Sequence, residues 1–329
     1  MLGNFLDKAS GLLDRNFLLA YWFPAFISAS IAVLIGAWPR GWGSALELWQ
    51  LEGMVKGQEG GLSAQILILV GALILITVLA YLLMPLTRPT VRFYEGYWPR
   101  WLYRRFGDMP RWGERAIYER MTKDLDQAEV KEDRPRFNEL QAVLFYGYPK
   151  RERLMPTRLG NALRAAEDYS KGAYGDGMDT VFWWPRLWPL LPEKVQEEVE
   201  EALTPMVALL NFSSLVAIVS IGGSLYLGGL GFLKEAVLVF AVGVVLAFIS
   251  YRAAVSQAQS YGERIRSAVD LYRFDLLKSL HQTLPETLDD EIALWVKLML
   301  WLYNGDRGCV AKMKYYHDSG SGSGGEGTP

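Results

Sequence analysis

The stretch MVALLNFSSLVAIVSIGGSLY, residues 206–226, decides the fold of this chain because it holds no charged residue and no histidine. A helix needs about 20 apolar residues to cross the roughly 30 Å of a membrane's hydrocarbon core. Three further windows have the same character, at 17–38, 66–86 and 236–255. The last window is uncharged only up to its sixteenth residue, but Arg252 can extend its charged end to the headgroups. The sequence therefore predicts four transmembrane helices.

The overall composition supports a membrane protein and excludes several other classes. Of 329 residues, 51% are hydrophobic and only 21% are charged, and the charges gather outside the four windows. This composition and charge distribution exclude a disordered chain, a collagen-like chain and a simple soluble enzyme. The single Cys309 cannot form an internal disulfide, and His281 and His317 are too few for a zinc cluster, a haem site or a Ser-His-Asp triad. A net charge of -2 gives no argument for nucleic acid. We expect no catalytic residues, no metal and no cofactor.

The distribution of lysine and arginine predicts the orientation of the four helices. The N-terminal segment, the long middle segment and the chain from Arg252 onward together carry 31 of these residues, whereas the two remaining loops carry three. Since basic residues stay on the cytoplasmic side, both termini are expected in the cytoplasm. The predicted segments outside the spans are a cytoplasmic N-terminus (1–16), an external loop (39–65), a cytoplasmic helical domain (87–205), a short external loop (227–235), a cytoplasmic helical tail (256–318) and a disordered Gly/Ser-rich linker (319–329).

The expected fold is thus an all-α integral membrane protein with two spans, a helical cytoplasmic insert, two more spans and a long helical tail. No proline interrupts residues 252–280, so the fourth span is expected to continue as one helix with its basic residues, Arg266 among them, on the polar side. A second helix is predicted over residues 290–303.

Small residues at intervals of three and four mark the third and fourth spans. Such residues let helix backbones approach closely in a membrane, where no hydrophobic effect drives helices together. The residues expected to pack are Ser213, Ala217 and Ser220 on the third span and Gly243, Ala247 and Ser250 on the fourth. The alternative is that the third span lines a pore through Asn211 and Ser214. Residues 17–38, 66–86, 206–226 and 236–251 hold no Asp, Glu, Lys, Arg or His, one of which proton-coupled transport usually requires.

An arginine-rich and aromatic stretch follows the second span, at residues 88–112, RPTVRFYEGYWPRWLYRRFGDMPRW. Arginines attract phosphate and aromatic rings settle at headgroup depth, so this arginine collar predicts binding to anionic lipid headgroups. Nucleic acid is the alternative for the same residue types, and the position beside a span favours lipid. The residues expected to bind lipid are Arg88, Arg92, Arg100, Arg104, Arg105, Trp98 and Trp101.

Two further stretches of the cytoplasmic part are unusual. FWWPRLWPLLP, residues 182–192, holds three tryptophans and three prolines, and we expect an irregular apolar ramp at the membrane interface because proline disrupts helices. YGDGMDT, residues 174–180, carries Asp176 and Asp179. These carboxylates could hold Mg²⁺ or Ca²⁺, but their spacing matches no known loop for either ion and favours turn chemistry.

Three stretches resemble segments of bacterial multi-pass membrane proteins to which no activity is assigned: PTRLGNALRAAEDY (156–169), DTVFWWPRLWPLLP (179–192) and IRSAVDLYRFDLLKSL (265–280). The resemblance implies a bacterial source, and hence the cell inner membrane. The order of spans is also that of bestrophin-type anion channels, an analogy of architecture without a shared motif.

Three functions remain open. The first is a non-enzymatic membrane scaffold or regulatory subunit, which would form a homo-oligomer or bind a membrane partner protein. The second is an oligomeric ion channel, and the third is an enzyme that acts on lipids.

Overall fold

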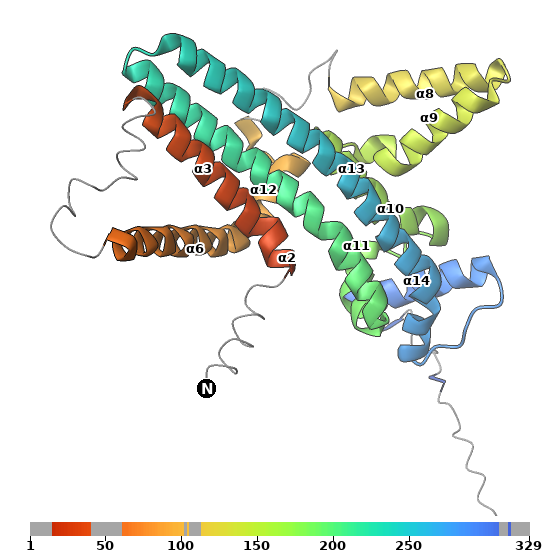
Figure 1. Ribbon diagram of the computed structural model, residues 1–329. Helices are drawn as coiled ribbons and strands as arrows, with labels where there is room; N and C mark the ends of the chain where they lie inside the picture. Colours follow the sequence, from red (N-terminus) through yellow and green to blue (C-terminus); the bar gives the residue numbers. More distant parts are fainter. Residues whose placement is uncertain (1–14, 41–60, 102–103, 105–112, 309–314, 317–329) are drawn as a thin grey trace, which may run out of the picture. The chain divides into compact units, whose positions relative to one another are not determined.

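The computed structural model is all-helical, which confirms the all-α part of the predicted fold class, and no strand occurs among the residues that it describes (Figure 1). The described residues are 15–40, 61–101, 104, 113–308 and 315–316. The predicted linker 319–329 and most of the predicted N-terminus and first external loop lie outside them. The elements are α2 (Arg15–Phe17), the π-helix η1 (Leu18–Trp22), α3 (Phe23–Ala37), η2 (Trp38–Arg40), α6 (Gly61–Glu95), α8 (Glu114–Val130), α9 (Arg134–Gly147), η3 (Arg151–Arg153), α10 (Arg158–Tyr174), α11 (Thr180–Leu187), η4 (Trp188–Leu190), α12 (Glu193–Gly229), α13 (Leu233–Ser279) and α14 (Leu288–Asn304).

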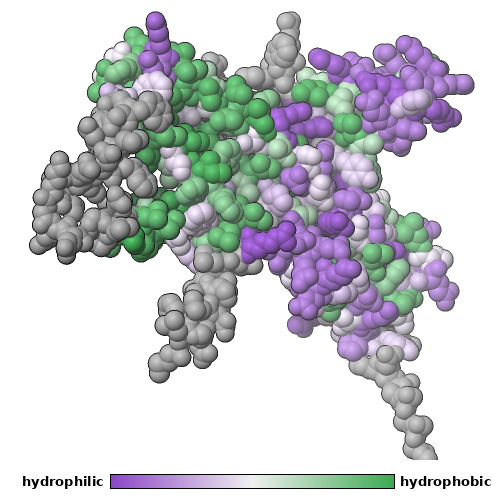
Figure 2. Space-filling view, viewed as in Figure 1, coloured by the Kyte–Doolittle hydropathy of each residue, from purple (hydrophilic) through white to green (hydrophobic). Residues whose placement is uncertain are grey.

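Four helical segments in the described part of the chain are long and apolar enough to cross a membrane. They are Arg15–Ala37, Leu69–Glu95, Glu193–Gly229 and Leu233–Ser279, and each contains or overlaps one of the four predicted windows. Figure 2 shows hydrophobic residues gathered over α3, α12 and the first part of α13. The fourth span continues without a break to Ser279, as its proline-free sequence predicts.

The chain forms two compact units. Unit 1 comprises Met1–Arg120, Met155–Asn161 and Glu200–Tyr261, and unit 2 comprises Met121–Leu154, Ala162–Val199 and Gly262–Pro329.

Within unit 1, α12 and α13 pack side by side in opposite directions (Figure 1). The Ser213 hydroxyl donates to the Ala247 carbonyl at 2.9 Å, and the Ser224 hydroxyl donates to the Ala236 carbonyl at 2.8 Å. Both bonds join a side chain of one helix to the backbone of the other. The two helices are therefore close enough for a serine to span the gap, which only small residues at the contact permit.

The middle of helix α6 packs on the first turns of the N-terminal span. Phe17, Ala25 and Ala80 form a small buried cluster there, and the Trp22 indole donates to Thr77 Oγ1 at 3.1 Å. Beyond this crossing the apolar side chains of α6 are exposed, with Leu67 72% accessible. Within this chain, α6 is thus the span with the least protein around it.

Unit 2 has a tryptophan-centred core. The rings of Trp183 on α11 and Trp295 on α14 lie 5.1 Å apart, and both side chains are almost completely buried. At Gly177 an added Cβ would lie 2.2 Å from the Val296 backbone nitrogen, so only glycine fits against α14 there. The Trp183 indole donates to the Gly177 carbonyl at 2.8 Å.

The prediction of an irregular backbone over residues 182–192 is wrong for residues 182–187, which are helical, whereas their location at a membrane interface stays a prediction. Residues Thr180–Leu187 form helix α11 with Pro185 inside it, and the Asp179 side chain caps its first turn. Trp183, Leu187 and Leu191 are buried in the core of unit 2. One proline costs a single helix hydrogen bond, and burial of a tryptophan offsets that loss.

Candidate functional site

Asn211, the main candidate for a pore, fills a defect in the first span. Pro24 has no N–H, so the Ala20 carbonyl four residues earlier loses its normal helix donor. The helix widens to a π-helix over Leu18–Trp22, and the Asn211 side-chain amide donates to the Ala20 carbonyl at 2.9 Å. Both residues are buried, at 3% and 4% exposure. The Asn211 side chain of α12 therefore forms a hydrogen bond with the backbone of the first span.

Ser214, the second pore candidate, also contacts protein. Its hydroxyl donates to the Leu210 carbonyl at 2.9 Å and lies 3.2 Å from the hydroxyl of Tyr94, at the end of α6. Tyr94 in turn donates to Ser213 Oγ at 3.0 Å and stacks on Tyr251 of α13. This small polar network connects α6, α12 and α13 within unit 1.

The structure brings together four of the six residues expected to pack. Ser213 bonds to the Ala247 backbone, and an added Cβ at Gly243 would lie 1.9 Å from Ser220 Oγ. Ala217 is half-buried and Ser250 is buried. The α12–α13 contact is therefore made within one chain, so a partner must use other faces.

The arginine collar lies at the end of α6 and just beyond it. Arg88 and Arg92 are on the helix itself, which continues to Glu95 and ends at Gly96 with a φ of +97°. Arg88, Arg92, Arg100 and Arg104 are exposed, and among the described residues none forms an ion pair; Arg105 lies outside the described residues. Trp101 is 71% exposed, whereas the half-buried Trp98 donates from its indole to the Phe93 carbonyl at 2.8 Å. The described arginines are thus available for an anionic surface.

The two aspartates weighed as metal ligands have different surroundings. Asp179 caps α11 through the Val181 backbone N–H at 2.9 Å, and its other oxygen lies 2.6 Å from Lys171 Nζ. Asp176 is exposed. The described residues hold no group of three side chains that could bind a metal ion. Asp179 therefore has the turn and capping role that its sequence context favours.

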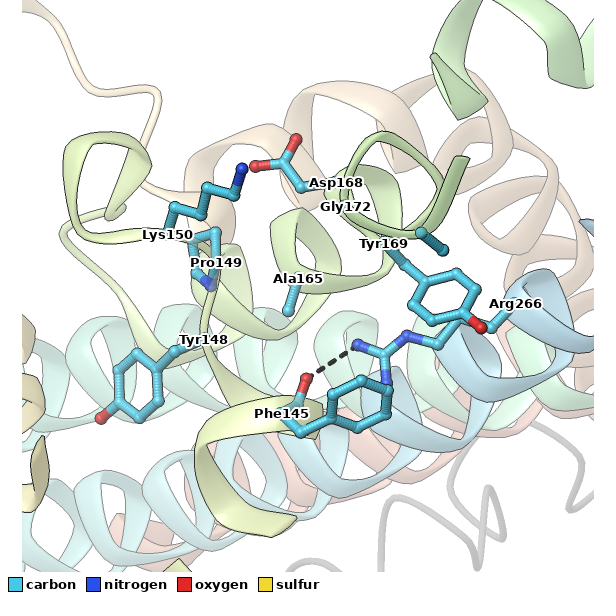
Figure 3. A pocket seen from close by; sticks show the side chains of 10 residues that line it. Phe145, Tyr148, Pro149, Lys150, Ala165, Asp168, Tyr169, Gly172 and Arg266 are labelled. Carbon is cyan, nitrogen blue, oxygen red and sulfur yellow. Dashed lines mark hydrogen bonds between the residues drawn. The ribbon is translucent and has the colours of Figure 1, made fainter. Parts of the chain in front are cut away.

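Sequence reasoning missed a cavity of about 340 Å³ in unit 2 (Figure 3). Phe145, Tyr148, Pro149 and Lys150, at the end of α9 and just after it, form one side of this cavity. Ala165, Asp168, Tyr169, Gly172 and Ala173 of α10 form another side, and Arg266 of α13 completes the lining. Apart from Lys150, Asp168 and Arg266, the lining is apolar or aromatic. The volume is at the lower end of ordinary ligand pockets.

Arg266 is the unusual residue of this cavity because it is a buried cation. It is 4% exposed, and its guanidinium lies 4.4 Å from the ring centre of Phe145 and 5.4 Å from that of Tyr169. Its Nη2 donates to the Phe145 carbonyl at 2.9 Å, whereas Nε and Nη1 are buried and have no hydrogen-bond partner in the described chain. The nearest carboxylate, Glu263, is 3.8 Å from Nη1 and about half exposed.

Asp168, on α10, carries a carboxyl group with a perturbed pKa. Burial raises this pKa above its ordinary value, against the opposite effect of Arg153, whose Nε lies 3.0 Å from Asp168 Oδ2. Arg164 and Lys171 also lower the pKa, and Asp179 raises it. Burial raises the pKa of neighbouring Glu167 as well. Two adjacent carboxyl groups of α10 therefore hold their protons more tightly in the folded chain.

We expect Asp168 to make unit 2 less stable as pH rises. The unfolded carboxyl titrates near 3.8 and the folded one higher, so the folded state binds more protons between these values. The free energy of unfolding then falls as pH increases from about 4 through the folded pKa. Asp168→Asn removes this contribution, so the thermal midpoint should change less with pH than in wild type. Thermal scans from pH 4 to 7 check this, with the exposed Asp176→Asn as control, and an unchanged pH slope in Asp168→Asn contradicts it.

The cavity escaped sequence analysis because its residues come from three distant segments. Arg266 follows a helical pattern in which basic residues occupy the polar side, which normally means exposure to water. The rings that cover it belong to α9 and α10, about 100 residues or more earlier in the chain. Nothing in the residues next to Arg266 in the sequence therefore marks its side chain as buried.

Comparison with known protein families, curated proteins and solved structures finds no match to this chain.

Proposed function

We propose that this chain is a non-enzymatic membrane scaffold or regulatory subunit of a bacterial inner membrane. The observation that best supports this proposal is that polar side chains of α12 form hydrogen bonds with the backbone of other helices. Asn211 and Ser213 donate to the backbone of neighbouring helices, and Ser224 does the same. Polar groups that satisfy helix backbones stabilise an assembly of spans and leave little polar surface for a water-filled path.

The exposed surface of the spans supports a role in assembly. Many large apolar side chains of α6 and α13 are exposed, and the buried cluster of α6 with the first span is small. In a membrane such faces are covered by lipid or by other helices. A second copy of the chain or a membrane partner protein is the proposed occupant of part of this surface.

An oligomeric ion channel is the alternative, and the Ser/Asn/Gly content of residues 206–226 favours it. Planar-bilayer recording of the purified protein separates the two functions. We expect no reproducible conductance from wild type. Single-channel currents that disappear in Ser214→Ala, a change that keeps the helix and removes only a hydroxyl, would overturn the scaffold proposal. A lipid-acting enzyme is the third candidate and rests on the arginine collar alone.

The proposed orientation places both termini, residues 87–205 and the tail in the cytoplasm, because these segments, counted with Arg252, carry 31 of the 34 lysines and arginines. The prediction is checked by single cysteines in a Cys309→Ser background. Gly57→Cys should react with an impermeant thiol reagent added outside intact cells, and Glu129→Cys should react only after the membrane is opened. The reverse pattern contradicts the orientation.

Anionic lipid is the proposed partner of the arginine collar. Arg88→Gln, Arg100→Gln and Arg104→Gln together should weaken binding to vesicles that contain anionic lipid, since each basic residue near such a surface contributes about 1 kcal/mol. Lipid copurification and vesicle flotation measure the effect. The matched control is a triple variant at exposed arginines outside the collar: Arg115→Gln, Arg134→Gln and Arg136→Gln. Equal lipid binding by wild type and the collar variant would contradict a headgroup role.

A further inference from the structure

The cavity of unit 2 has the composition of a site for a small organic anion. It combines a largely apolar lining with a buried cation, Arg266, whose Nε and Nη1 have no hydrogen-bond partner in the described chain; the lining also holds Lys150 and Asp168, whose carboxylate oxygens are buried and without a hydrogen bond there. A buried charge without a close partner is costly, and proteins normally pair such a group or bind a counter-ion to it. In Figure 3 the guanidinium lies between Phe145 and Tyr169, among the side chains that line the cavity.

The other ionic groups of the cavity do not neutralise Arg266. The Asp168 carboxylate is paired with Arg153 at 3.0 Å, and Asp270 accepts hydrogen bonds from Tyr169 at 2.9 Å and Tyr174 at 2.8 Å. Glu263 lies beyond hydrogen-bond distance and is open to water, which screens its charge. Lys150 also lines the cavity, and in Figure 3 its ammonium group points toward the Asp168 carboxylate.

The geometry points to a binding site for a small anion that carries a carboxylate or phosphate on an aromatic or other apolar body. The anionic group accepts one charge-assisted hydrogen bond from Nε or Nη1 of Arg266, the two nitrogens without a hydrogen-bond partner in the described chain, which point to different sides of the guanidinium. The apolar body lies against Pro149, Ala165 and Ala173. Both donors are covered by protein, so binding requires a neighbouring side chain to move, and Phe145, which is 48% exposed and whose ring centre lies 4.4 Å from the guanidinium, is the side chain that we expect to do so.

Gly172 provides a variant that tests the cavity without disturbing the fold. It lies on α10 and lines the cavity, and a Cβ added there meets no atom within 4 Å. Gly172→Leu therefore adds a bulky side chain at the cavity wall without a backbone clash and is expected to block the cavity, and replacing a helical glycine favours folding. Gly71→Leu on α6 is the matched control, because a Cβ there also meets no atom within 4 Å.

Isothermal titration calorimetry of the full chain in detergent tests the proposal. The three probes, benzoate, phenyl phosphate and benzamide, share a phenyl ring and differ in the polar group attached to it. We expect at least one of the two anions to bind and neutral benzamide to bind at least about tenfold more weakly, because it lacks the charge-assisted hydrogen bonds. The preferred anion distinguishes a carboxylate ligand from a phosphate ligand. Binding of neither anion at millimolar concentration, or equal binding of benzamide, overturns the site.

Two variants then locate the binding. Gly172→Leu should abolish it while the thermal midpoint stays equal or rises, and Gly71→Leu should leave it unchanged. Arg266→Met keeps the length of the side chain without the charge, and loss of a buried charge is often tolerated. It should weaken anion binding about tenfold or more. Unchanged binding in folded Gly172→Leu or Arg266→Met would assign the anion to another place and overturn the proposal.

Discussion

Gly243→Leu should prevent α12 and α13 from packing and should remove most of the folded protein. A Cβ at this position would lie 1.9 Å from Ser220 Oγ and 2.2 Å from Ser220 Cβ, whereas real Cβ contacts under 3.0 Å essentially never occur. Ser220 sits on the facing helix and is 5% exposed, so it has little room to move. Overpacking of this kind costs about 1–3 kcal/mol and sometimes more. Monodisperse yield and thermal midpoint in detergent measure the loss.

The control for this prediction is Gly222→Leu on α12. An added Cβ there meets no atom within 4 Å, so the same change of size should leave folding intact. A second test uses the smaller Gly243→Ala, whose destabilisation Ser220→Gly should relieve because it removes both clashing atoms. Equal thermal midpoints for Gly243→Leu and Gly222→Leu would show that the α12–α13 contact is not tight.

Asn211→Leu should destabilise the contact between α12 and the first span by more than an ordinary interhelical hydrogen bond. Such bonds in membranes average about 0.6 kcal/mol. Here the acceptor is the Ala20 carbonyl, which Pro24 deprives of its usual donor. A buried acceptor left without a partner costs about 1–3 kcal/mol, and the bilayer core holds no water to replace the lost donor. Thermal unfolding of the purified variant in detergent measures this cost.

A double-mutant cycle with Pro24→Ala tests whether Pro24 is the cause of the large effect of Asn211→Leu. Alanine at this position restores an N–H that can bond to the Ala20 carbonyl in a regular helix, so Asn211 loses its special role. We expect Asn211→Leu to be clearly milder in the Pro24→Ala background than in wild type. If the two substitutions change the free energy of unfolding additively, the hydrogen bond of Asn211 does not depend on Pro24.

The four spans could be predicted from the sequence because hydrophobic length depends on local composition alone. Windows such as 206–226 carry this information without reference to any partner. The continuous helix past Arg252 followed in the same way from the absence of proline. Contacts between distant segments were the part that sequence could not supply.

Three residues have surroundings that could not be predicted from the neighbouring sequence. Trp183 reads as an interfacial residue until α14 is known to cover it. Arg266 reads as a surface charge until the rings of Phe145 and Tyr169 are placed around it. Asn211 could have been assigned with one further step, since a proline within a span predicts an unsatisfied carbonyl four residues earlier. Which side chain reaches that carbonyl still depends on how the spans pack.

The bond between Asn211 and Ala20 also has a consequence for biosynthesis. Its partners are 191 residues apart, so the first span is made long before its hydrogen-bond donor exists. At about 5–20 residues per second, the ribosome needs roughly 10–40 s to cover that distance. During this interval the Ala20 carbonyl must accept a hydrogen bond from water, from lipid headgroups or from the insertion machinery. The first pair of spans is therefore expected to remain near the interface or bound to the translocon until the third span arrives.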